Sequence, residues 1–140
     1  MDLTTAIEWA RSRKHAVLIT LRMDGRAQSS DIVYVVEDGS FVISLTNTRA
    51  KTKNIIRDPR IILHITEPAS WSYLSFDGTV ELSDVTTAVD DVTNDALVSY
   101  YEAIAGEPHS DWDEYRQAMV DEGRLLATFT PTSVVGQING

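Results

Sequence analysis

HAVLITLRMDGRAQSSDIVYVVEDGSFVISL (residues 15–45) decides the fold, because three apolar, β-rich runs in it are separated by two short turns. The turns, MDGR (23–26) and Asp38-Gly39, each contain an Asp-Gly pair. Asp-Gly supplies the positive φ that a tight β-hairpin requires. One hairpin following another favours an antiparallel sheet or barrel over a fold of alternating strands and helices.

The segments outside this stretch predict further strands and four helices. The return strand of the first hairpin is predicted at 27–37, and later strands at 60–66, 71–83, 124–131 and 133–138. The predicted helices are 3–13, 46–58, 88–105 and 111–122. Pro59 ends the second helix, Ser110 is the predicted N-cap of the fourth, and Asp77-Gly78 predicts a break in the long strand. The sequence therefore predicts one mainly β, α+β domain over 1–140, barrel-like, with a helical insertion at about 86–122.

The composition is that of a globular chain with an acidic surface. Hydrophobic residues make up 43% of the chain and the net charge is −9, which disfavours nucleic acid and anionic membranes as partners. The absence of cysteine excludes disulfides and thiolate zinc sites. No apolar run has the length of a signal peptide or a membrane span. We therefore expect a cytoplasmic protein.

The common catalytic and metal-binding motifs are absent. His15, His64 and His109 are scattered and do not pair at metal-ligand spacing, so no metal site is predicted. The chain also lacks the G-x-S-x-G elbow, the H-E-x-x-H helix, the P-loop and the G-x-G-x-x-G turn. No catalytic residue can be named from these patterns.

A basic cluster is the remaining candidate for chemistry. Five of the twelve Lys and Arg residues lie within a twelve-residue span: Arg49, Lys51, Lys53, Arg57 and Arg60. From Glu67 to Glu122, by contrast, the chain has fourteen acidic residues and a single base. The segment SLTNTRAKTKN (44–54) marks the start of the predicted helix, where free N–H groups and the helix dipole attract phosphate. Thr46 and its neighbours add short polar side chains there. A phosphate site and a solvated helix start both remain open.

Four segments resemble one known family. TRAKTKNIIRDPR (48–60) resembles the cofactor motif of actinobacterial flavin/deazaflavin oxidoreductases, in the pyridoxamine-5′-phosphate-oxidase-like split-barrel superfamily. DGRAQSSDI (24–32) is similar to the first hairpin of that family, and WSYLSFDGTVEL (71–82) to its long central strand. AGEPHSDWDEYRQAMV (105–120) resembles the helical insertion of the branch that binds coenzyme F420. The resemblance spans nearly the whole chain.

The resemblance implies a split β-barrel of the FMN-binding type and a homodimer with the cofactor at the subunit interface. Residues expected around the phosphate and ribityl region of the cofactor are Ser44, Thr46, Arg49, Ala50, Lys51 and Asn54. Gln28 and Ser30 are expected near the ring system, and Arg57 and Arg60 at the edge of the site. Trp71 and Tyr73 are expected to reach the pocket of the neighbouring chain. Each of the last three pairs has an alternative structural interpretation. It is a solvent-facing polar edge for Gln28 and Ser30, helix-end and surface charge for Arg57 and Arg60, and core or dimer packing for Trp71 and Tyr73.

The function that the resemblance implies is F420-dependent oxidoreduction. A hydride would pass between C5 of the deazaflavin and an unsaturated small-molecule substrate, and the cofactor would carry the chemistry, which explains the lack of an evident acid–base pair. FMN is the alternative cofactor, because Arg49 and Lys51 can hold its phosphate equally well. A non-catalytic protein that binds a flavin, F420 or a tetrapyrrole is the third possibility.

Overall fold

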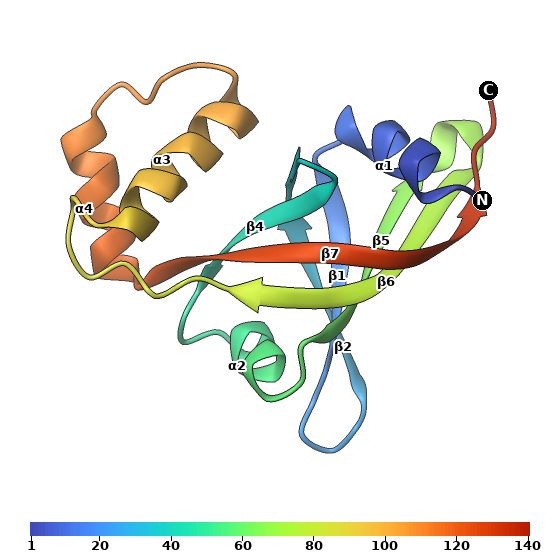
Figure 1. Ribbon diagram of the computed structural model, residues 1–140, viewed down its shortest axis with the longest axis horizontal. Coiled ribbons are helices and arrows are strands. Elements are labelled where there is room, and N and C mark those ends of the chain that lie inside the picture. Colours follow the sequence, from blue (N-terminus) through green and yellow to red (C-terminus); the bar gives the residue numbers. More distant parts are fainter.

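A curled antiparallel sheet forms the body of the computed structural model, which describes residues 1–140. Its seven strands are ordered β2-β1-β5-β6-β7-β4-β3, and the sheet curls into a half-barrel (Figure 1). The strands are β1 (His15–Leu21), β2 (Ala27–Val33), β3 (Val35–Glu37), β4 (Ser40–Thr46), β5 (Arg60–Glu67), β6 (Ser72–Leu82) and β7 (Arg124–Gln137). The predicted split-barrel, α+β fold is therefore confirmed.

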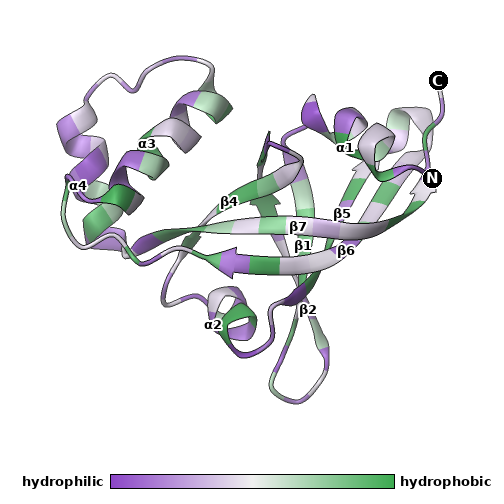
Figure 2. Cartoon of the chain, viewed as in Figure 1, coloured by the Kyte–Doolittle hydropathy of each residue, from purple (hydrophilic) through white to green (hydrophobic).

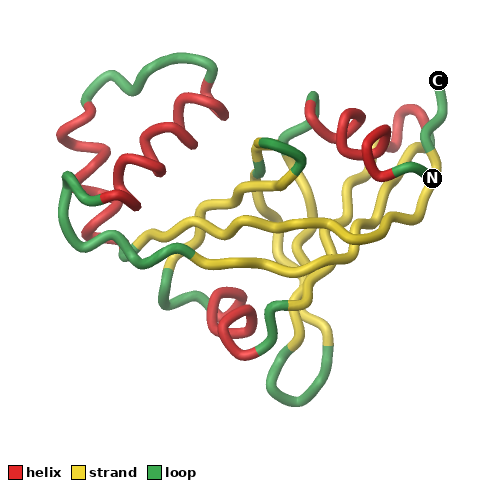
Figure 3. Tube along the Cα trace, viewed as in Figure 1, coloured by secondary structure: helices red, strands yellow, loops and turns green.

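Four α-helices surround the sheet: α1 (Leu3–Arg11), α2 (Ala50–Arg57), α3 (Val92–Ala105) and α4 (Trp112–Glu122). A short 3-10 turn, Pro68–Ser70, joins β5 to β6. Figure 3 shows α3 and α4 as a helical hairpin beyond one end of the sheet, within the predicted insertion. Helix α2 begins at residue 50 instead of 46 and α3 at 92 instead of 88, because a turn and a capping loop precede them. None of the helices has the length and apolar character needed to cross a membrane.

The predicted return strand 27–37 is wrong as a single strand. It is divided at Tyr34 into β2 and β3, which lie at opposite edges of the sheet. The backbone N–H of Tyr34 donates to the carbonyl of Lys14 (2.9 Å), and its hydroxyl donates to the carbonyl of Ala10 (2.8 Å). The chain thus crosses from one edge of the sheet to the other at Tyr34, which these two hydrogen bonds hold in the core. This crossing leaves a gap between the edges of β2 and β4, where the barrel is split.

The two predicted closing strands are a single strand, β7. It pairs with β4 near its start and with β6 along its length. The prediction of two strands is wrong, because Pro131, a residue type that commonly ends a strand, lies opposite Gly78 at a register shift, where a missing N–H is tolerated. A side chain at Gly78 would have its Cβ 2.1 Å from the Thr130 carbonyl oxygen. Strand β6 is therefore continuous at Asp77-Gly78, where a break was predicted, and the register shift there leaves Thr132 of β7 as the extra residue.

Two separate hydrophobic clusters hold the fold together. The main core fills the half-barrel and is centred on Phe41, whose ring lies 5.1 Å from that of Phe76 and 5.8 Å from that of Phe129. A smaller cluster contains Val42, Leu97, Tyr115 and Leu126 and joins the α3–α4 hairpin to the outer side of β4 and β7. Figure 2 shows apolar segments along these strands and on the facing sides of the helices. The hairpin thus depends on its own contacts with the barrel edge.

Three of the four α-helices begin at an aspartate. The carboxylates of Asp2, Asp91 and Asp111 accept the N–H groups of Thr4, Asn94 and Glu114 at 2.8, 2.8 and 3.1 Å. The predicted Ser110 cap is wrong, because Asp111 holds the capping position and its own N–H donates to Nδ1 of His109 (2.9 Å). Helix α2 differs from the other three, because Arg49 is its N-cap residue and no side chain caps it.

Candidate functional site

The N-terminus of α2 presents backbone donors without acceptors. Arg49 has the extended backbone of an N-cap residue (φ −71°, ψ 148°), but it carries no acceptor group. The N–H groups of Ala50, Lys51 and Thr52 meet no carbonyl or side-chain acceptor in the chain. The Thr52 hydroxyl donates to the Thr46 carbonyl (2.7 Å), which fixes the turn before the helix. This arrangement suits an external anion.

A cavity of about 460 Å³ lies beside this helix start, at the split of the barrel. Its lining comes from the edges of β2 and β4, from the start of α2 and from the α3–α4 hairpin. Ser44, Lys51, Tyr100, Tyr101, Tyr115 and Arg124 are among the lining residues. The cavity therefore joins a cationic region to an aromatic wall.

Tyr100 connects the hairpin to the split. Its hydroxyl donates to the carbonyl of Val33, the last residue of β2 (3.0 Å). Burial raises the pKa of Tyr100, and the backbone amide of Ser44 and the charge of Arg124 partly oppose this rise. The hydroxyl thus anchors α3 to the end of β2, close to the backbone of Ser44 in β4. This contact positions the aromatic wall over the cavity.

Two cations, Lys51 and Arg124, line the cavity, and the charge of Arg49 acts on Lys51 from beside it. Burial lowers the pKa of Lys51, and the nearby charges of Arg49 and Arg124 lower it further. The only ion pair in this group is that of Arg124 with Glu122, with Nη2 2.9 Å and Nε 3.0 Å from the same carboxylate oxygen. The positive charge is therefore only partly balanced, and a bound anion would raise the pKa of Lys51 back toward its ordinary value.

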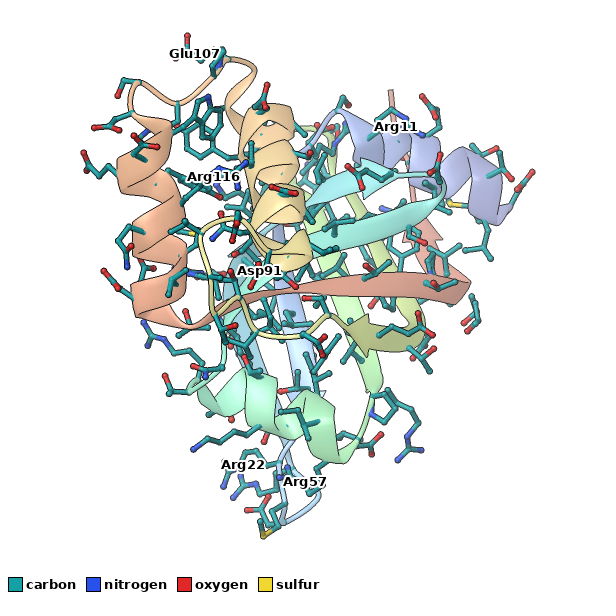
Figure 4. All side chains as sticks on the ribbon, turned by 60° about the vertical axis from the view of Figure 1, so that its left-hand side comes forward. Arg11, Arg22, Arg57, Asp91, Glu107 and Arg116 are labelled. Atoms are coloured by element: carbon teal, nitrogen blue, oxygen red, sulfur yellow. The ribbon has the colours of Figure 1, made fainter.

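Asn54, Gln28 and Arg57 form a hydrogen-bond network away from the cavity. The Asn54 amide donates to Oε1 of Gln28 (3.2 Å) and to the hydroxyl of Thr20 (3.0 Å), and its carbonyl oxygen accepts from Arg57 (2.9 Å). Arg57 also donates to the carbonyl of Leu21 (2.9 Å). Figure 4 shows Arg57 next to Arg22 at the β1–β2 hairpin, far from the α3–α4 side. In this chain the network fastens α2 to β1 and β2.

The other predicted site residues are distributed around the cavity or away from it. Ser44 and Lys51 line it, and Thr46, Arg49 and Ala50 belong to the turn and helix start beside it. Ser30 lies half-buried on β2. Arg60 forms an ion pair with Asp58 (2.8 Å), which lowers the pKa of Asp58 to about 2. Trp71 follows the 3-10 turn with a left-handed backbone (φ 57°), and 81% of it is exposed.

Arg124 and the three tyrosines of the wall were not predicted from the sequence. Arg124 follows a long acidic stretch, so its isolation among acids was an available signal. Only the pairing of β4 with β7, in which Thr46 faces Arg124, brings it next to α2. Tyr100 and Tyr101 are adjacent in α3, a pattern that core packing explains equally well from sequence. No group of three or more metal-binding side chains is present.

The half-barrel, its split and the helical insertion define a split-barrel protein. The chain belongs to the family described as pyridoxamine 5′-phosphate oxidase, which matches residues 4–135. A conserved hypothetical protein from Mycobacterium tuberculosis has a similar fold, with a TM-score of 0.75, 20% identity, and coverage of 97% of this chain and 84% of that one.

Two further structures indicate how varied the proteins with this fold are. A protein described as an F420 reductase matches with a TM-score of 0.60 and 22% identity over 87% of this chain and 89% of its own. The heme storage protein HutZ of Vibrio cholerae matches with a TM-score of 0.68 and 15% identity over 100% of this chain and 96% of its own. At these identities the likeness concerns the fold alone.

Proposed function

We propose that this protein is an oxidoreductase that binds a phosphate-bearing flavin-type cofactor, coenzyme F420, with FMN as the alternative. The observation that carries the proposal is the uncapped start of α2, where free N–H groups lie next to Arg49 and Lys51. Membership of the family and the similar fold of an F420 reductase support it.

The residues of this chain would bind and orient the cofactor. The amides of Ala50 and Lys51 and the side chains of Arg49 and Lys51 would hold its phosphate, since they combine free donors with positive charge. The cavity between the barrel edge and the tyrosine wall would exclude water from the reacting groups. When bound, the cofactor supplies hydride transfer to or from an unsaturated small molecule.

The choice of F420 over FMN rests on the sequence resemblance. The extended basic run from Arg49 to Arg60 also favours F420 in the sequence, because the longer anionic tail of F420 suits an open basic groove. Arg57 and Arg60, however, are engaged with Leu21 and Asp58 of the same chain. The remaining cations of this run at the helix start, Arg49 and Lys51, suit the phosphate of either cofactor.

Fluorescence titration with F420 and FMN, side by side, tests the proposal. We expect Lys51→Ala to weaken binding of the preferred cofactor by about ten- to a hundredfold, the effect of losing one charge-assisted contact. The matched control is Lys53→Ala, two positions along the same helix, where the lysine is exposed and unpaired. Equal affinities for both variants and the unchanged protein would overturn the proposal. Tight F420 binding without oxidation of reduced F420 by a panel of activated alkenes and quinones would identify a cofactor carrier instead.

We further propose that the protein is a homodimer. Trp71, Tyr73 and Val135 are exposed by 81%, 41% and 66% and lie at the same end of β6 and β7. An exposed apolar patch of this kind suits a second copy of the chain, and the sequence resemblance implies a cofactor site at a subunit interface. Sedimentation equilibrium should give about twice the chain mass of 15.6 kDa. A mass of one chain at micromolar concentration would refute the dimer.

A further inference from the structure

Arg124 has hydrogen-bonding capacity that the fold does not use. Glu122 accepts from Nε and Nη2 through a single carboxylate oxygen. Nη1 has no hydrogen-bond partner in the chain. Because every buried side-chain nitrogen and oxygen in the chain has a partner, the unpaired Nη1 is not buried. This end of the guanidinium is therefore accessible, and Arg124 lines the cavity. Two parallel N–H groups at that end match the two oxygens of a carboxylate.

The cavity around this guanidinium is aromatic instead of polar. The hydroxyl of Tyr115 donates to the Leu97 carbonyl (2.8 Å) and that of Tyr100 to the Val33 carbonyl (3.0 Å). Because both hydroxyls are engaged, these residues offer mainly their rings to a ligand. Tyr101 packs edge-on against Tyr115, with ring centres 5.1 Å apart, and also lines the cavity. Rings arranged in this way stack on a flat conjugated body.

The charges of the cavity are asymmetric. Arg124 at the start of β7 and Lys51 at the start of α2 both line the cavity and lie close enough to interact, whereas Asp31, which also lines it, belongs to β2. A carboxylate is attracted to the two cations and repelled by Asp31. A ligand with one acidic end would therefore enter in one orientation.

We propose that Arg124 and the tyrosine wall form a substrate subsite for a compact aromatic carboxylate, separate from the phosphate site at the start of α2. The subsite rests on the proposed function, because it would hold the substrate of that oxidoreductase. Arg124 would bind the carboxylate end-on while Tyr100, Tyr101 and Tyr115 contact the ring system. A volume of about 460 Å³ is sufficient for a ligand of this size.

Calorimetric titration with 2-naphthoate and its neutral analogue 2-naphthamide tests the subsite. The unchanged protein should prefer the carboxylate by about tenfold or more, the effect of a charge-assisted bidentate contact. Arg124→Gln should bring the two affinities within about twofold of each other, and Arg124→Lys, which keeps the charge without the fork, should give an intermediate preference. Glu122→Gln should retain the preference, since it leaves the guanidinium in place. Thermal melting of each variant checks that the fold is intact.

The outcomes separate this inference from the proposed function. An unchanged preference in Arg124→Gln, or no preference in the unchanged protein, overturns the subsite. A loss of F420 affinity in Arg124→Gln as large as that in Lys51→Ala, together with an unchanged naphthoate preference, would place Arg124 in the phosphate site and also overturn it. Naphthoate discrimination that depends on Arg124, in a protein that binds neither F420 nor FMN, would instead refute the proposed function and leave the carboxylate site standing.

Discussion

The N-termini of α2 and α3 differ in whether the free N–H groups of the first helical turn have acceptors in the chain. At α3, the carboxylate of Asp91 accepts N–H groups from Thr87 (2.8 Å), Ala88 (3.1 Å) and Asn94 (2.8 Å) and the hydroxyl of Thr86 (2.8 Å). These hydrogen bonds lower the pKa of Asp91 to about 2. At α2, the equivalent position is occupied by Arg49, and the first amides of the helix have no acceptor.

The difference separates a structural helix start from one that is open to a ligand. Asp91 satisfies the amides and complements the dipole of α3 with negative charge. Arg49 and Lys51 put positive charge at the positive end of the α2 dipole, which is unfavourable in the isolated chain. A bound anion would make the second arrangement favourable. The following predictions test this contrast.

Arg49→Asp gives α2 the kind of cap that α3 has, and we expect the largest effect from it. The affinity for F420, measured by fluorescence titration, should fall more than roughly a hundredfold, because a cation is lost and a carboxylate is placed against the phosphate. The melting temperature should rise by about 2–5 °C, because the new carboxylate can accept the free amides of the first turn.

Lys53→Asp provides the control for Arg49→Asp. It makes the same change of charge on an exposed face of the same helix but adds no N-cap. Long-range charge alone should lower its F420 affinity by no more than about tenfold relative to the unchanged protein. Its melting temperature should not rise. If Arg49→Asp left the affinity unchanged, the start of α2 would not be the phosphate site.

Asp91→Ala removes the cap of α3, and a smaller effect on stability alone is expected. The melting temperature at pH 7, followed by circular dichroism, should fall by roughly 3–8 °C, because three N–H groups and a hydroxyl lose their acceptor. Asp91→Asn keeps one accepting oxygen and should lie between the alanine variant and the unchanged protein. F420 binding below the melting transition should be unaffected, since Asp91 does not line the cavity.

Asp90→Ala is the matched control, since the neighbouring carboxylate makes no hydrogen bond or ion pair in the chain. The pH dependence gives a second check. The pKa of Asp91 is lowered from 3.8 to about 2 on folding, so its stabilising effect is complete well above pH 4 and is lost as the pH falls through 3.8 toward 2. The difference in melting temperature between Asp91→Ala and the unchanged protein should therefore become smaller over this pH range. A difference that stays constant down to pH 2 would contradict the role given to the carboxylate.

Local sequence predicted the hairpin turns and the helical insertion but not the path of the strands. Gly25 and Gly39 have the positive φ expected of both turns (84° and 79°). The sequence pattern does not indicate that 27–37 is divided into two strands, because Ile32, Tyr34 and Val36 are all buried and continue one alternating pattern across the break. Alternation reports which face of a strand is buried, and it carries no information on which edge finds a partner.

The candidate site was also only partly readable from the chain. The motif at 48–60 located Lys51, which lines the cavity, and Arg49 at the helix start beside it, but the same motif contains Asn54 and Arg57, which bind Gln28 and Leu21 inside the fold. One turn of helix separates side chains that face a cavity from those that face the sheet. That direction depends on how α2 docks onto β1 and β2.

The sequence by itself determined the hairpin turns and the concentration of positive charge at one helix start, because these depend on neighbours a few residues apart. The tertiary structure alone decided that Arg124 lies beside Lys51 and that tyrosines from α3 and α4 cover the split between β2 and β4. Those contacts join segments that are far apart in the chain, and they follow from strand register and helix packing, which no local pattern specifies.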